Sequence, residues 1–171
     1  MDLRKQVQNM KNNAQGQIFE GMIKTACVIY GQQCRAEVEK VPEPFKVTKK
    51  HGNGEFTGRF TAKASPDFSG TLDGGKAIHF EAKYTTTDQM KRNVLTDEQM
   101  RSLETHTQRG AITGVCVGIQ DKYFFVPWTI WKNMKLHYGR QYVTAADLER
   151  YRVRFNGAVL FLDYVSEGER A

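Results

Sequence analysis

Three residues in the stretch 66–83 have the chemistry of a metal-dependent site: Asp67, Glu81 and Lys83. The two carboxylates are 81 − 67 = 14 positions apart, a spacing that suits the two arms of a hairpin. Carboxylate oxygens are preferred ligands of hard divalent cations such as Mg²⁺. A neighbouring lysine can orient or deprotonate a water, or offset charge on a phosphoryl group. The pattern therefore predicts a divalent-cation site.

A hairpin must bring these residues together. Asp73-Gly74 is a strong turn signal, because glycine adopts the positive φ of a primed turn without steric cost. From Lys76 to Lys83, apolar and polar side chains alternate. The apolar ones are Ile78, Phe80 and Ala82, and the polar ones are His79, Glu81 and Lys83. We expect the apolar set to face a core. A solvated strand face with a surface ion pair would show the same alternation, and this alternative stays open.

The elements around the hairpin predict a mixed α/β fold. We expect, in chain order, a helix over 13–31, a strand over 35–40, an excursion over 45–63, the hairpin, a helix over 97–109, strands over 111–119 and 123–126, and short helices over 129–138 and 144–150. The segment 157–165 is expected to be a last strand or a packed C-terminal segment. Thr96 and Gln99 form a capping box at the start of the 97–109 helix. Residues 1–12 are predicted to be a mobile arm, and 166–171 a polar tail of a single domain spanning 1–171.

The excursion at 45–63 is strongly basic. Its five basic residues against the one acid Glu55 give a local charge of 5 − 1 = +4; they are Lys46, Lys49, Lys50, Arg59 and Lys63. A Gly-rich tip at 51–54 and few apolar residues indicate a projecting β-hairpin, with a disordered basic loop as the alternative.

Composition narrows the class of protein. The 171 residues carry a formal net charge of +6, which suits a polyanionic partner such as nucleic acid. No run of 18 apolar residues and no signal-peptide core occurs, so we expect a cytoplasmic protein with no membrane partner. The three cysteines lack a CxxC pair and are predicted to be reduced thiols.

The order of Asp67 and Glu81-Ala82-Lys83 resembles the PD-(D/E)xK nucleases. The match extends along 13–131 to the RecU-type Holliday junction resolvases and their phage relatives. It is carried by the helix at 13–20, by Val41-Pro42-Glu43-Pro44, by the approach to Asp67 at 63–70, by Phe80-Glu81-Ala82-Lys83, and by Gln99, 110–119 and Phe125-Val126-Pro127.

The resemblance implies a restriction-endonuclease-like fold with a mixed β-sheet flanked by helices. It implies a homodimer that cuts four-way DNA junctions with Mg²⁺, or alternatively Mn²⁺. The basic excursion at 45–63 would be the stalk that enters the junction, with its five basic residues as DNA contacts.

The resemblance also assigns site residues. Asp67, Glu81 and the Ala82 carbonyl would hold the metal, Lys83 would activate water, and Glu20 would complete the acidic cluster. From the residues alone, Glu20 could equally be a surface side chain. A role for Gln99 stays open, because Glu98 and Ser102 stand where the family often has histidines.

Two rival functions remain. One rival is a restriction or repair nuclease of the same class, which would need a loop that reads bases. The basic excursion found in place of such a loop argues against this rival. A non-catalytic DNA-binding recombination accessory protein would have no need to place acids beside DNA.

Overall fold

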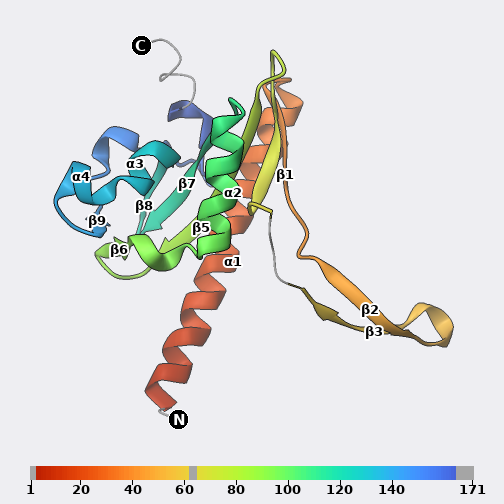
Figure 1. Ribbon diagram of the computed structural model, residues 1–171. Coiled ribbons are helices and arrows are strands. Elements are labelled where there is room, and N and C mark those ends of the chain that lie inside the picture. The colour runs from red at the N-terminus through yellow and green to blue at the C-terminus, as the bar shows by residue number, and fades with distance from the viewer. Residues whose placement is uncertain (1–2, 62–64, 165–171) are drawn as a thin grey trace.

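A five-stranded mixed sheet forms the centre of the protein (Figure 1). The computed structural model describes residues 3–61 and 65–164. The sheet order is β1-β4-β5-β7-β8, in which β5 and β7 run parallel and the other neighbours run antiparallel. These strands are β1 (Ala36–Lys40), β4 (Phe68–Leu72), β5 (Ala77–Thr85), β7 (Ile112–Ile119) and β8 (Lys122–Pro127). The predicted mixed α/β architecture is confirmed.

The two faces of the sheet have separate cores. On one face lies α1 (Leu3–Gln32), whose Phe19, Ile23 and Tyr30 are buried at helical spacing. The other face is covered by α2 (Asp97–Gln108) and a C-terminal layer, in which Leu103 and Trp131 are buried. That layer contains β6 (Gln89–Lys91), α3 (Trp128–Lys132), α4 (Met134–Tyr138) and β9 (Tyr142–Thr144), with short 3-10 turns at Arg92–Val94 and Glu149–Tyr151.

Strand β5 divides its side chains between these faces. Ile78, Phe80 and Ala82 belong to the core on the α1 side. Because side chains alternate along a strand, Glu81 and Lys83 face the α2 side. The predicted alternation therefore places Glu81 and Lys83 under the layer that contains α2.

The basic excursion projects from the body as a two-stranded ribbon, the stalk (Figure 1). Its strands are β2 (Phe45–Lys50) and β3 (Phe56–Phe60), and all but one of their residues are exposed. A 3-10 turn at Gly52–Gly54 forms the tip, where Asn53 has a φ of 63°. The protruding β-hairpin is thus present, and the alternative of a disordered loop does not hold for its described residues.

Several predicted boundaries were wrong. The first helix begins at Leu3, so most of the predicted arm at 1–12 belongs to α1. A helix predicted over 144–150 is instead β9 followed by a short 3-10 turn, because 142–144 pairs with β6. The segment predicted as a last strand or a packed C-terminal segment is the latter over its described residues: Val159, Phe161 and Leu162 are buried in the core on the α1 side, and Val159 forms an isolated bridge with Phe155. The predicted polar tail at 166–171 lies outside the described residues.

Among the described residues, no helix is both long enough and apolar enough to cross a membrane.

Gly70 allows β1 and β4 to approach closely. It lies opposite Val38, and a Cβ there would stand 2.1 Å from the Glu37 carbonyl oxygen. We expect Gly70→Ala to reduce the free energy of unfolding by about 1–3 kcal/mol, because backbone rather than a flexible side chain must move. Urea unfolding measures the change. Gly21→Ala is the control, since nothing lies within 4 Å of its new Cβ. An unchanged urea midpoint for Gly70→Ala would contradict this account.

Candidate active site

The β4–β5 hairpin brings Asp67 beside Glu81. Phe68 pairs with Phe80, so Asp67 lies one residue before β4 and next to Glu81 on the neighbouring strand. The backbone N–H of Ala82 donates a hydrogen bond to Asp67 Oδ2 at 3.0 Å. This bond fixes the Asp67 carboxylate against β5.

Lys83 stands between the two carboxylates. Its Nζ is 3.4 Å from Glu81 Oε2 and 3.7 Å from Asp67 Oδ2. Glu81 is fully buried and Asp67 is only 8% exposed. Buried carboxylates are costly unless a cation compensates them, so this group differs from a solvated surface ion pair. The alternative of a solvated strand face is excluded.

Helix α2 supplies a fourth member of the group. The Gln99 side chain accepts a hydrogen bond from the Thr96 N–H at 3.0 Å and donates one to Glu81 Oε2 at 2.6 Å. One amide thus closes the predicted capping box and orients the Glu81 carboxylate. The sequence identified the cap but left open the role of Gln99, because its contact with Glu81 depends on how α2 packs on the sheet.

Two histidines extend this face of β5. The rings of His79 and His106 stack with centroids 3.8 Å apart, and His79 Nδ1 is 2.9 Å from Ser69 Oγ. Burial lowers the pKa of His79, and the nearby His106 lowers it further. His106 is half-buried rather than ordinary surface. Sequence alone gave no signal for this pair, since the residues are far apart in the chain.

Glu20 does not join the carboxylates. It forms a salt bridge with Lys40 at the end of β1. Lys40 shares the side of β1 on which Ala36 and Val38 pack toward α1, whereas Glu81 faces α2. Within the described residues, no three His, Cys, Asp or Glu side chains converge to hold a metal ion. The predicted three-carboxylate cluster is therefore not formed, because the sheet separates Glu20 from Glu81.

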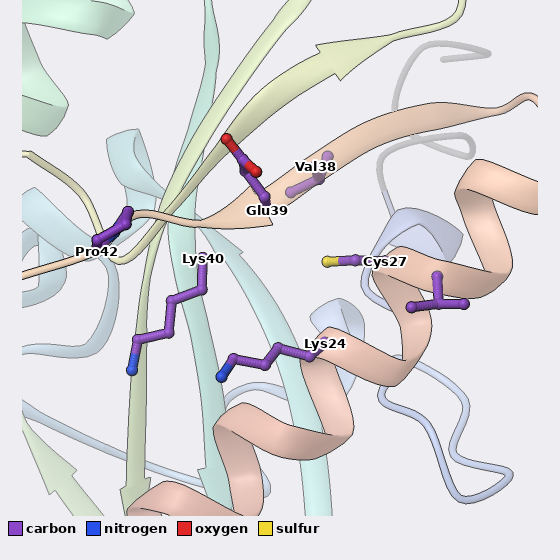
Figure 2. Close-up of a pocket in the computed structure, with 7 residues that line it drawn as sticks. Lys24, Cys27, Val38, Glu39, Lys40 and Pro42 are labelled. Carbon is purple, nitrogen blue, oxygen red and sulfur yellow. The ribbon is translucent and has the colours of Figure 1, made fainter. Parts of the chain in front are cut away.

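A groove of about 460 Å³ lies beside the Glu20–Lys40 pair, between α1 and β1. Figure 2 shows Lys24 and Lys40 extending toward the same end of it, with the sulfur of Cys27 pointing into the space between helix and strand. Burial raises the pKa of the Cys27 thiol to about 12, so the thiol stays protonated at neutral pH. The other residues that line the groove are mostly apolar. The groove is therefore a poorer candidate for a catalytic site than the paired carboxylates on the α2 side of the sheet.

The donor set fits a hard divalent cation. Asp67 and Glu81 offer two carboxylates, which is the number that Mg²⁺ often takes from a protein, with waters and substrate phosphate completing its shell. Ala82, whose carbonyl is the third predicted ligand, follows Glu81 directly in sequence, and its N–H donates to Asp67. The structure thus brings together Asp67, Glu81, Lys83 and Gln99.

The predicted DNA-binding residues lie on the stalk. Lys46 pairs across the ribbon with Arg59, and Lys49 and Lys50 follow toward the tip. These four side chains are exposed. Lys63 lies outside the described residues.

Paired carboxylates and a lysine on neighbouring strands of a mixed α/β sheet have the form of the PD-(D/E)xK nuclease class. The family model described as Recombination protein U, RecU, matches residues 14–167. The chain therefore belongs to the RecU family, a family of Holliday junction resolvases.

One solved structure similar to this chain is Hjc, a Holliday junction resolvase from the archaeal hyperthermophile Archaeoglobus fulgidus. The identity is 11% and the TM-score 0.48, over 83% of this chain and 97% of that one. A comparison with curated proteins found no match.

Replacing Lys83 by methionine should destabilise the metal-free protein, because two buried carboxylates would lose their shared cation. We expect the free energy of unfolding to fall by about 1–3 kcal/mol. This is less than for a fully buried ion pair, because the Lys83 side chain is 22% exposed. Urea unfolding in EDTA measures it, with the exposed Lys76→Met as control.

Adding Glu81→Gln to the Lys83→Met variant should recover part of the loss, since one buried charge is then removed. A double variant less stable than Lys83→Met would contradict this charge balance.

Proposed function

We propose that this protein is a structure-selective endodeoxyribonuclease that resolves four-way DNA junctions by Mg²⁺-dependent phosphodiester hydrolysis. The observation that carries the proposal is the position of Lys83 between the buried carboxylates Asp67 and Glu81. A protein that only binds DNA gains nothing from buried acids near a polyanion. Family membership and the basic stalk support a branched DNA substrate.

Each residue has a distinct role in this mechanism. Asp67 and Glu81 hold the cation, with the Ala82 carbonyl as a further ligand. Gln99 keeps Glu81 in position through its side-chain amide. Lys83 orients the attacking water and offsets negative charge at the phosphoryl group. When bound, Mg²⁺ polarises the phosphoryl oxygen and offsets charge on the leaving 3′-oxygen. Glu20 has no role in this mechanism, because its salt bridge with Lys40 holds it on the α1 side of the sheet.

The working unit would be a homodimer. A four-way junction has two-fold symmetry, and each chain supplies one Asp67–Glu81 pair. A C₂ dimer would therefore place two sites symmetrically and nick two strands as a pair.

One experiment tests these statements together. The protein is incubated with Mg²⁺ and labelled four-way junction, linear duplex or single strand, and its mass is measured by sedimentation. We expect a dimer and paired nicks in the junction alone. Equal cutting of linear duplex would favour a nuclease with another target. Junction binding without cutting would favour an accessory protein, and symmetric nicking by a monomer would rule out the dimer.

Asp67→Asn and Glu81→Gln should each abolish cutting while junction binding persists. Removing a carboxylate weakens the cation site and reduces repulsion of the DNA backbone. Single-turnover cleavage and gel-shift titration measure the two effects. Glu149→Gln is the matched control, because Glu149 is an exposed acid that pairs with Arg152 far from the hairpin in sequence. Wild-type cleavage by either site variant would refute the metal-site assignment.

The stalk should be needed for junction recognition and not for folding, since its strands bury almost nothing. Replacing 48–58 by a short Gly-Ser turn should leave the melting temperature nearly unchanged and reduce junction affinity more than duplex affinity. Equal junction affinity and selectivity in the shortened protein would contradict this.

Changing Lys49 and Lys50 together to alanine should flatten the salt dependence of binding. The expected change in slope is about 0.9 for each lost phosphate contact, so roughly 2 for both. Lys135→Ala, at an exposed lysine of α4, is the control. A slope equal to that of the wild type would remove both lysines from the DNA contacts.

A further inference from the structure

A cavity of about 510 Å³ adjoins the candidate active site at the carboxyl end of β5. Lys83 belongs to both, because its Nζ contacts Asp67 and Glu81 and the residue is also part of the cavity lining. A DNA strand whose phosphate lies at the carboxylates would therefore have its next nucleotide at the cavity mouth. The volume falls in the range of about 300–1,000 Å³ that is typical of small-ligand sites.

The walls of the cavity are held in place by hydrogen bonds. The hydroxyls of Thr85 and Thr87 are 2.8 Å apart, and the Thr87 hydroxyl donates to the Gln89 carbonyl at 2.9 Å. On the far side, β6 pairs with β9, and Arg92 Nε donates to the Lys132 carbonyl at 3.3 Å. The cavity is thus a formed feature of the fold rather than a gap beneath a loose loop.

The lining suits a nucleobase. Gln89 and Asn93 bring side-chain amides, which both donate and accept hydrogen bonds as base edges require. Val94 provides apolar surface and is 40% exposed, while Met90 is buried behind the wall in the core. Exposed Lys91 places a positive charge at the same wall, next to where a backbone phosphate would pass.

We propose that this cavity receives the base of the nucleotide beside the scissile phosphate, and that Asn93 reads its edge. The inference rests on the proposed nuclease function and gives it a sequence preference. Extruding a base costs least where its pairing or stacking is already disturbed, and a protein that opens the branch point disturbs the stacking there. In Figure 1, β6 and the stalk lie on opposite sides of β5, so the stalk of the same chain does not occupy this cavity.

Cleavage rates test the reading of the base. Four-way junctions that differ only in the base pair next to the cut are compared in single-turnover assays. For the wild type we expect rates that differ by at least about fivefold between bases, the discrimination of one well-made base contact. Asn93→Ala should bring all four rates to within about twofold of one another. Asn133→Ala, at an exposed asparagine between α3 and α4, should keep the wild-type pattern.

Crosslinking separates this inference from the nuclease activity. Wild-type protein in EDTA is irradiated on junctions with single 4-thiothymidines at each position flanking the branch point. Crosslinks to residues 87–94 from one of these positions support the base site, even if the protein proves unable to cut. Crosslinks confined to the stalk, or an Asn93→Ala cleavage profile equal to that of the wild type, overturn it.

Discussion

The contact of Lys83 with two buried carboxylates is the interaction on which this structure depends. Asp67 and Glu81 would repel each other out of water, and the ammonium between them makes their burial tolerable. A divalent cation would offset the same repulsion more strongly. Two buried carboxylates held side by side are the kind of oxygen ligands that a hard divalent cation prefers.

The surrounding elements hold this group in place. The hairpin sets the separation of the carboxylates, because each carboxylate lies next to one of two paired phenylalanines. The rings of Phe68 and Phe80 stack in the core with their centroids 5.0 Å apart. Helix α2 fixes Glu81 through Gln99, whose amide is itself tied to the helix N-cap. Several of these contacts thus belong both to the site and to the elements of the fold that carry it.

The stalk differs from the site, whose carboxylates are buried. It carries charge and exposed side chains, contributes almost nothing to the cores, and projects from the body (Figure 1). Under the proposed function, the buried acidic site would carry out the chemistry and the protruding basic ribbon would recognise the DNA. In Figure 1, β6, which lines the cavity, and the stalk lie on opposite sides of β5, so under the proposed function a strand at Lys83 would lie between the cavity and the stalk.

The sequence by itself determined the local features. Alternation along 76–83 and the glycines near residue 74 specified the hairpin, and the capping box specified the start of α2, because these signals act between residues near in sequence. Only the tertiary structure decided that Gln99 contacts Glu81 and that Glu20 pairs with Lys40 instead. Those contacts depend on which face of the sheet each helix covers, and no short-range pattern encodes that choice.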